Sequence, residues 1–219
     1  MHDEISPYYP IFLNIRGKKC LVVGGGKVAL RKVQAFLECG ANVQVVGPIL
    51  CPELRRLAKS GVIQAFQRSY KAEDLQDTVI AIAATDDAKT NESMAAEARR
   101  QRILINVVDD PQHSDLIAPS SFRRGEVTIA VSTSGRSPAL ARKLKSKLEK
   151  DFGTEYAQLA MLVSEVRTEL KQQKITVDTE AWQEALDLNL LTELLKDGKI
   201  QEAKDTLLKN LKASGKRKR

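Results

Sequence analysis

Residues 19–29 read Lys-Cys-Leu-Val-Val-Gly-Gly-Gly-Lys-Val-Ala, an apolar run followed at once by three glycines. The run Lys19–Val23 has the composition of a strand that is buried on both faces, and the residues after it favour a helix. Gly24, Gly26 and Ala29 fit the pattern G-x-G-x-x-A. In this pattern the first glycine makes a tight turn, the second lets the backbone approach a pyrophosphate, and the small last residue lets the helix pack on the strand. The stretch therefore predicts a strand, a phosphate-binding turn and a helix.

The rest of the first half repeats this alternation of apolar runs and helical stretches. Such an order predicts a parallel sheet with helices on both faces, which is a doubly wound, Rossmann-like α/β fold. The expected strands are Lys19–Val23, Val43–Val46, Val62–Phe66, Val79–Ala83 and Ile103–Val108. The expected helical stretches are Val28–Glu38, Pro52–Ser60, a short turn near Glu73, and Asn91–Gln101.

After Asp109 the pattern changes to an irregular segment, 110–122, which is followed by one more expected strand, Glu126–Ser132. A helix should begin next, with Ser137 as N-cap and Pro138 at its first position. Apolar residues four apart give this helix one apolar face: Leu140, Leu144, Leu148 and Phe152.

From Thr154 onward the sequence predicts helices only. A second apolar stripe predicts a further buried helix face, formed by Trp182, Leu186, Leu190 and Leu194. Gly198 predicts a turn, and the basic run Lys216–Arg219 predicts a frayed end. We expect three parts: a dinucleotide-binding domain (1–115), a small α+β segment (116–152) and a C-terminal helical domain (153–219).

The composition narrows the classes of protein. The N-terminal residues contain acids and prolines where a secretory signal needs a basic start and an apolar core, and no apolar run is long enough to span a bilayer, so we expect a cytoplasmic protein. Cys20, Cys39 and Cys51 form no CxxC pair, and we expect them to be small buried side chains. His113 stands alone on an expected loop and reads as polar surface, so no metal site is predicted.

The net charge of +7 favours an anionic partner. Residues 123–147 hold seven basic residues against one acidic residue, a local balance of +6. The nature of the anion is not fixed by charge alone.

The end of the second expected strand lacks one feature of dinucleotide sites. An acidic residue that binds the ribose 2′-hydroxyl is absent, and the sequence there is Val46-Gly-Pro-Ile49. Backbone groups around Pro48 and Ile49 could hold the ribose instead. Because no arginine stands there to pair with a 2′-phosphate, we expect NAD rather than NADP. The alternative is that Gly47-Pro48 only ends a strand.

Five stretches of the chain resemble one family, the siroheme synthase dehydrogenase domain (precorrin-2 dehydrogenase/sirohydrochlorin ferrochelatase). They begin at Tyr9 (YPIFL), Val22 (VVGGGKVALRK), Ala81 (AIAATDD), Ile105 (INVVDDP) and Val131 (VSTSGRSPALAR), and together they span about the first two-thirds of the chain. The last stretch is similar to the family's dimerisation segment, so the resemblance implies a homodimer. Where some relatives carry a phosphorylatable serine in that stretch, this chain has Thr133.

The resemblance also implies site residues. NAD contacts fall on Lys27, Val28, Pro48 and Ile49, and Thr85 and Asp86 line the cofactor cleft, beside Gly24 and Gly26 of the glycine pattern. The catalytic residue it implies is Asp109, at the carboxyl end of the fifth strand, with Asp110 as the nearest rival. The residues alone leave a turn role for Asp109 equally open.

The activity that the resemblance implies is the NAD-dependent oxidation of precorrin-2 to sirohydrochlorin, with ferrous iron insertion as a possible second step. Asp109 would accept the proton while NAD accepts the hydride. The substrate is a tetrapyrrole with many carboxylates, and its candidate ligands are Arg123, Arg124 and Arg136, since arginine can bind a carboxylate with two hydrogen bonds. Lys143, Lys145 and Lys147 read as a solvated helix face. Because no methyltransferase domain follows, a separate uroporphyrinogen III methyltransferase is expected upstream.

Two other readings stay open at this point. One is a redox-sensing Rossmann module that binds NAD and nucleic acid; the sequence offers no helix-turn-helix with a basic recognition helix, so we expect no nucleic-acid partner. The other is a chelatase that has lost the oxidation. The complete glycine pattern at 24–29 argues against that loss.

Overall fold

The computed structural model describes residues 8–216, and these form parts of two compact units, Met1–Ala118 and Pro119–Arg219. We call them the N-terminal unit and the C-terminal unit. The expected tail Lys216–Arg219 lies almost wholly outside the described residues. The boundaries predicted at 115 and 152 stay predictions. Within residues 8–216, no helix has both the length and the apolar composition that crossing a bilayer requires.

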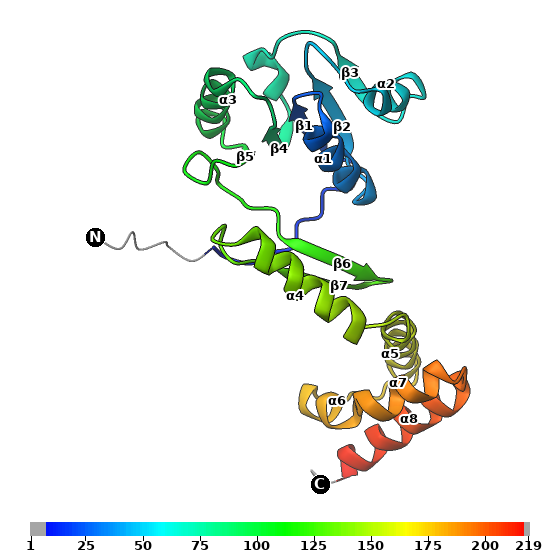
Figure 1. Ribbon diagram of the computed structural model, residues 1–219. Coiled ribbons are helices and arrows are strands. Elements are labelled where there is room, and N and C mark those ends of the chain that lie inside the picture. The colour runs from blue at the N-terminus through cyan, green and yellow to red at the C-terminus, as the bar shows by residue number, and fades with distance from the viewer. Residues whose placement is uncertain (1–7, 217–219) are drawn as a thin grey trace. The chain divides into compact units, whose positions relative to one another are not determined.

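The N-terminal unit is a doubly wound α/β domain (Figure 1). Its five strands are all parallel and lie in the order β3-β2-β1-β4-β5. The strands are β1 (Lys19–Val23), β2 (Asn42–Val46), β3 (Gln64–Phe66), β4 (Thr78–Ala83) and β5 (Leu104–Val107), and the helices are α1 (Lys27–Glu38), α2 (Pro52–Lys59), the 3₁₀ turn η1 (Ala72–Leu75) and α3 (Ala88–Arg100). The predicted Rossmann-like fold is confirmed.

The core of this unit lies on both faces of the sheet. Alternate residues of β1 point to opposite faces, so that Val22 packs with α1 and α2 while Leu21 and Val23 pack with η1 and α3. Both faces are buried, which is why the strands of the sequence are nearly uniform apolar runs. The predicted strand Lys19–Val23 agrees with β1 at both ends.

The C-terminal unit begins with an antiparallel hairpin. It pairs β6 (Ser120–Arg124) with β7 (Val127–Val131). The prediction of one strand here was wrong, because β6 lies inside the segment that we expected to be irregular. Only Phe122 of β6 is apolar and buried, so the sequence carries no alternating pattern for this strand. Gly125 has a φ of 56°, which suits the tight connection between the strands.

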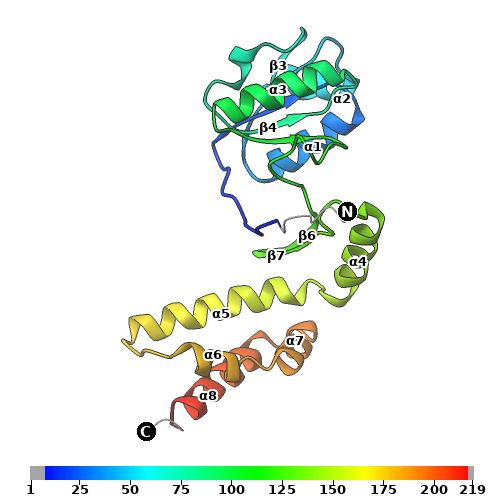
Figure 2. The same ribbon diagram turned by 90° about the vertical axis from the view of Figure 1, so that its left-hand side faces the viewer.

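Five helices follow the hairpin (Figure 2). They are α4 (Pro138–Asp151), α5 (Glu155–Gln172), α6 (Thr179–Ala185), α7 (Leu188–Lys196) and α8 (Ile200–Lys216). The N-cap prediction for α4 is confirmed, since the backbone N–H of Leu140 donates to the Ser137 hydroxyl at 3.2 Å. A separate core holds α5 to α8 together, with Leu162, Val166, Leu191 and Leu207 among its buried side chains.

Two further local predictions were wrong, one for the helices α6 and α7 and one for the cysteines of the N-terminal unit. The stripe Trp182–Leu194 belongs to two helices, because Asp187 caps α7 by accepting from the Leu190 N–H at 3.1 Å. Of the three cysteines only Cys20 is buried; Cys39 ends α1 and is exposed, and Cys51 is half-buried.

Candidate functional site

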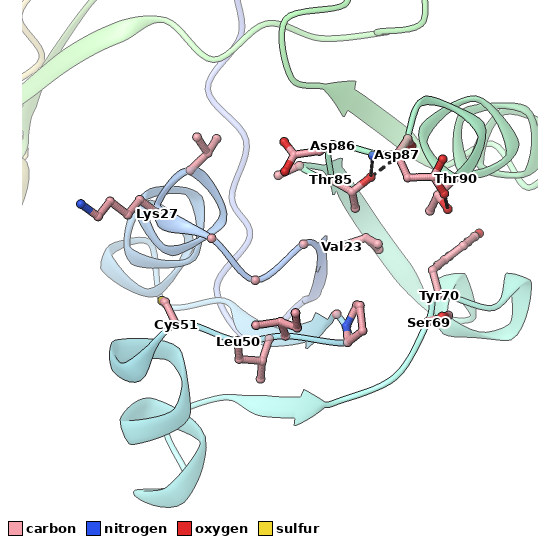
Figure 3. A pocket seen from close by; sticks show the side chains of 18 of the residues that line it. Val23, Lys27, Leu50, Cys51, Ser69, Tyr70, Thr85, Asp86, Asp87 and Thr90 are labelled. Carbon is pink, nitrogen blue, oxygen red and sulfur yellow. Dashed lines mark hydrogen bonds between the residues drawn. The ribbon is translucent and has the colours of Figure 1, made fainter.

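A cavity of about 820 Å³ lies at the carboxyl edge of the parallel sheet. Its walls come from the segments that directly follow four strands: 24–28 after β1, 47–52 after β2, 69–70 after β3 and 84–90 after β4. Figure 3 shows Lys27 and Cys51 on one side of the cavity and Tyr70 and Thr90 on the opposite side. This edge is where open α/β sheets bind their ligands.

The glycine loop is held in place by backbone hydrogen bonds from two neighbouring segments. The Gly24 N–H donates to the Val46 carbonyl at 2.8 Å, and the Cys51 N–H donates to the Gly25 carbonyl at 2.8 Å. Gly24 has a φ of 130°, and a Cβ there would lie 2.2 Å from the Ala84 carbonyl oxygen. A Cβ on Gly25 would lie 1.8 Å from the Ile49 carbonyl oxygen. The fold therefore requires glycine at both positions.

Gly26 differs from its two neighbours. A Cβ built on Gly26 meets no protein atom within 4 Å, so packing of the protein does not require glycine there. Gly26 is also the N-cap of α1, and no side chain caps the first turn of that helix. The open space beside Gly26 and the uncapped N–H groups of α1 fit the pyrophosphate of a dinucleotide.

All eight residues that we predicted as cofactor contacts line this cavity: Gly24, Gly26, Lys27, Val28, Pro48, Ile49, Thr85 and Asp86. The side chain of Ile49 is 81% exposed and that of Val28 is 39% exposed. These two apolar side chains offer a surface for a flat ring. Contact of any of the eight with a cofactor stays a prediction.

Thr85 has a structural role within the wall. Its hydroxyl bonds the Asn91 amide oxygen at 2.8 Å, and the Asn91 amide donates to the Thr85 carbonyl at 3.0 Å (Thr85 is labelled in Figure 3). Asp87 caps α3 beside it. A hydrogen bond from the Thr90 hydroxyl is the main cause that lowers the pKa of Asp87, and the N–H groups of Lys89 and Thr90 add to it. Asp87 is therefore a carboxylate at neutral pH.

Sequence reasoning missed Ser69 and Tyr70, which follow β3 and close one side of the cavity. The Tyr70 hydroxyl is buried and, among residues 8–216, has no hydrogen-bond partner. Burial, followed by the charges of Glu97 and Asp74, raises the pKa of Tyr70 to about 12, so the phenol stays protonated. The rule that strand ends line the site could have found both residues.

The segment that carries Ser69 and Tyr70 is anchored by the ion pair of Arg68 with Asp74. Two hydrogen bonds of 2.8 and 2.6 Å join the guanidinium to the carboxylate, and the Lys71 N–H donates to it at 2.9 Å. Asp74 itself is only 5% exposed. Burial by itself raises the pKa of Asp74, but the hydrogen bonds from Arg68 and Lys71 outweigh it, and the pKa lies below the ordinary 3.8.

We expect Asp74→Asn to lower the free energy of unfolding by about 1–2 kcal/mol, because it leaves a partly buried guanidinium with weaker acceptors. Since folding lowers the pKa of Asp74, its contribution is complete above its ordinary pKa of 3.8 and is lost as the pH falls below that value. Urea unfolding at pH 7 and pH 3 measures both effects. Glu53→Gln, which removes an exposed pair with Arg56, is the control and should unfold like the wild type. Equal midpoints for Asp74→Asn and wild type at pH 7 would contradict the anchoring role.

Asp109 lies on the turn after β5, at the same edge of the sheet but outside the lining of the cavity. It is exposed and has a φ of 60°. Its carboxylate makes no hydrogen bond to any residue in 8–216. The rival candidate Asp110 differs, because its carboxylate is bonded to His113 at 2.6 Å.

A third residue that sequence reasoning missed is Lys32 of α1. It is half-buried, and its ammonium donates to the Asn106 amide oxygen at 3.4 Å. Burial, with some help from Arg31, lowers the pKa of Lys32, while attraction to Asp109 opposes that lowering. A cation therefore lies near Asp109 and Asn106.

The three arginines predicted to bind the substrate belong to the C-terminal unit and do not form one cluster there. Arg123 is exposed, and its guanidinium contacts the Thr128 hydroxyl at 3.3 Å. Arg124, on the opposite face of β6, donates to the carbonyls of Phe152 and Glu149 at the end of α4. Arg136 is exposed in the turn before α4. Arg124 thus has a structural role, and substrate binding by the three stays a prediction.

We expected Lys143, Lys145 and Lys147 of α4 to lie on a solvated face, and this is wrong for Lys145. Lys145 is half-buried, pairs with Glu149 and lies 5.9 Å from the centre of the Phe122 ring. The apolar side chains Leu140 and Leu144, by contrast, are 50% and 40% exposed. The described residues hold no group of three or more side chains that could bind a metal ion.

The comparisons with known proteins agree with this geometry. Residues 11–120 match a family described as "Putative NAD(P)-binding", and residues 124–150 match one described as "Sirohaem biosynthesis protein central". The siroheme synthase of Nitrosococcus oceani is 39% identical over 202 residues, which are 91% of this chain and 43% of that protein. The siroheme synthase of Chromobacterium violaceum is 38% identical over 210 residues, which are 95% of this chain and 44% of that protein.

Among solved structures, one titled "SirC, precorrin-2 dehydrogenase" matches with a TM-score of 0.68 and 25% identity, over 94% of this chain and all of that chain. The chain spans less than half the length of the two siroheme synthases. It belongs to the siroheme synthase N-terminal family, with a nucleotide-binding module over residues 11–120 and the family's central segment after it.

Proposed function

We propose that this chain catalyses the NAD-dependent oxidation of precorrin-2 to sirohydrochlorin. The observation that carries the proposal is the cavity at the sheet edge, with its glycine loop and the open space at Gly26. The name of the solved relative, precorrin-2 dehydrogenase, and the siroheme synthases that match over most of this chain support the choice of substrate. The substrate is then a tetrapyrrole that carries many carboxylates.

Bound NAD supplies the hydride acceptor. The chain's own residues do the rest: the N–H groups at the start of α1 bind the pyrophosphate, and Val28 and Ile49 present apolar surface to a ring of the cofactor. Asp109 accepts the proton that leaves the macrocycle in the same oxidation. Lys32 provides a positive charge that attracts the Asp109 carboxylate.

The charge of the cavity favours NAD over NADP. Among the described residues that line it, Lys27 is the one cation, whereas Asp86 and Asp87 are two carboxylates. The segment after β2, where a 2′-phosphate would lie in this fold, offers Gly47, Pro48 and Ile49. A 2′-phosphate would gain no paired cation there and would be repelled by the carboxylates.

An anaerobic assay with precorrin-2 tests the proposal. We expect NADH to form in step with the pigment change, and kcat/KM with NAD to exceed that with NADP by at least about tenfold, because like charges in a site are strongly unfavourable. Metal insertion into sirohydrochlorin with no NAD-dependent oxidation of precorrin-2 would leave a chelatase as the better reading. Salt-dependent DNA binding with no oxidation would favour the redox-sensing module.

The proposal extends to the assembly and the supply of substrate. Leu140 and Leu144 leave an apolar stripe exposed on α4, which supports a homodimer that buries it. Precorrin-2 would come from a uroporphyrinogen III methyltransferase.

A further inference from the structure

The turn after β5 is closed by hydrogen bonds and holds three titratable side chains within five residues, Asp109, Asp110 and His113. The Asp110 N–H donates to the Val107 carbonyl at 3.2 Å. The Ser114 hydroxyl donates to the Asp110 carbonyl at 2.7 Å and accepts from the Val107 N–H at 2.9 Å. Because strand β5 is parallel to β1 and β4, this turn lies at the same sheet edge as the cavity.

His113 and Asp110 form a directed pair in this turn. The distance from His113 Nδ1 to Asp110 Oδ2 is 2.6 Å, and the His113 N–H donates to Asp110 Oδ1 at 3.2 Å. The hydrogen bond from His113 is the main cause that lowers the pKa of Asp110, so Asp110 is a carboxylate and can only accept. The proton of the neutral imidazole is therefore on Nδ1, and the lone pair is on Nε2.

The pair leaves Nε2 available. The His113 side chain is 39% exposed, and Nε2 has no hydrogen-bond partner in residues 8–216. A carboxylate that fixes the tautomer and orientation of an imidazole is the arrangement by which enzymes prepare histidine as a base. Asp109, four residues before His113, also has a free carboxylate. The turn thus presents two separate proton acceptors.

We propose that His113, positioned by Asp110, is a second proton acceptor of this site and acts when a divalent metal ion is inserted into the tetrapyrrole. This inference rests on the proposed function, because it takes the same macrocycle as the substrate. It goes beyond the expectation that His113 is polar surface.

The number of protons released distinguishes the two reactions. In the oxidation the macrocycle loses one hydride to the nicotinamide and one proton, for which Asp109 suffices. In metal insertion two pyrrole N–H bonds break, the metal ion exchanges water ligands for the four ring nitrogens, and nothing is oxidised or reduced. Asp109 accepts one of these protons and His113 Nε2 accepts the other, and both protons then pass to water. The metal ion enters as a substrate.

A purely structural pair makes a different prediction. Asp and His three residues apart also stabilise turns, and a pair with that role alone would matter for folding but not for proton transfer. Chemical rescue separates the two, because imidazole in solution can replace a missing proton acceptor but cannot rebuild a turn.

The experiment measures both reactions of the full chain, with NAD and precorrin-2 for the oxidation, and with sirohydrochlorin and Co²⁺ or Fe²⁺ for the insertion. We expect His113→Asn to lower the enzyme-dependent rate of insertion about 100-fold, a usual effect of losing a general base, and to lower the oxidation rate by no more than about threefold. Added imidazole should restore much of the insertion rate. Asp110→Asn should lower the insertion rate about tenfold with little change in KM, because the imidazole is kept but its orientation is lost.

Gln112→Ala, which changes an exposed side chain of the same turn, is the matched control and should insert metal at the wild-type rate. The proposal is overturned if the wild type shows no insertion above the uncatalysed rate, if His113→Asn inserts metal normally, or if both reactions fall equally and imidazole restores neither. Failure of the proposed oxidation is a separate result, since it would be seen as a lack of NADH formation by the wild type with precorrin-2 and NAD.

Discussion

Asp109→Asn is expected to lower the rate of precorrin-2 oxidation by about 10²–10⁴-fold, the range usual for loss of a positioned proton acceptor. The affinity for NAD should stay as in the wild type, because Asp109 lies outside the lining of the cavity. Asparagine is the right replacement, since it has nearly the shape of aspartate and tolerates a left-handed backbone, whereas alanine would add strain at a φ of 60°. Single-turnover formation of NADH measures the rate, and calorimetric titration measures the affinity.

Asp77→Asn is the matched control for this variant. Asp77 also has a left-handed φ, 59°, but it connects η1 to β4 at the amino end of that strand and is absent from the cavity lining. The control should oxidise precorrin-2 like the wild type. If Asp109→Asn does the same, the proton acceptor is another group, and His113 becomes the first candidate for the oxidation as well.

The fold of the N-terminal unit could be predicted because the burial of each strand is visible in the composition of its own stretch of sequence. A parallel strand that is covered on both faces is mostly apolar, and β1 and β4 are apolar after their first residue, while β2 has the single buried polar residue Gln44 between its valines. The start of α3 was predicted three residues late, at Asn91 instead of Ala88. The signal that could have corrected it is Asp87, whose side chain caps the helix.

The C-terminal unit was harder to predict because its signals depend on tertiary contacts. β6 has one apolar residue, Phe122, and its stability comes from pairing with β7 and from the packing of α4 on the hairpin. The stripe from Trp182 to Leu194 has the spacing of one helix, yet α6 ends at Ala185 and Asp187 caps the start of α7. A periodic pattern cannot distinguish a continuous helix from two helices that bury the same face.

The residues of the candidate site likewise fall into those that the sequence could predict and those that it could not. Residues next to the glycine loop or directly after a strand could be placed by the rule that ligands bind at the carboxyl edge of the sheet. Lys32 and the pair of Asp110 with His113 could not, since Lys32 meets Asn106 only when α1 packs beside β5, and the pair forms only when the turn after β5 folds. The sequence offered one histidine beyond the N-terminus, His113, and its partner is defined only by the geometry of the turn.

The glycine loop yields the sharpest test of the cofactor site. Gly26→Ala is expected to weaken NAD binding by about 10- to 100-fold, because the new methyl group would occupy space that the protein leaves open for the pyrophosphate, and forced contacts of this kind cost about 1–3 kcal/mol. The loss in folding stability should be about 1 kcal/mol, because alanine is a poorer N-cap than glycine but its Cβ would meet no protein atom within 4 Å. Calorimetric titration with NAD and thermal unfolding without NAD measure the two effects separately.

Gly24→Ala is the control for the effect of Gly26→Ala on NAD binding. There the new Cβ would lie 2.2 Å from the Ala84 carbonyl oxygen in a backbone with a φ of 130°, so the apo-protein itself should melt at a markedly lower temperature. The two variants separate a glycine that the fold needs from a glycine that only the ligand needs. Tight binding of NAD by Gly26→Ala would mean that the pyrophosphate does not pass over this loop, and the cavity would then have to bind some other ligand.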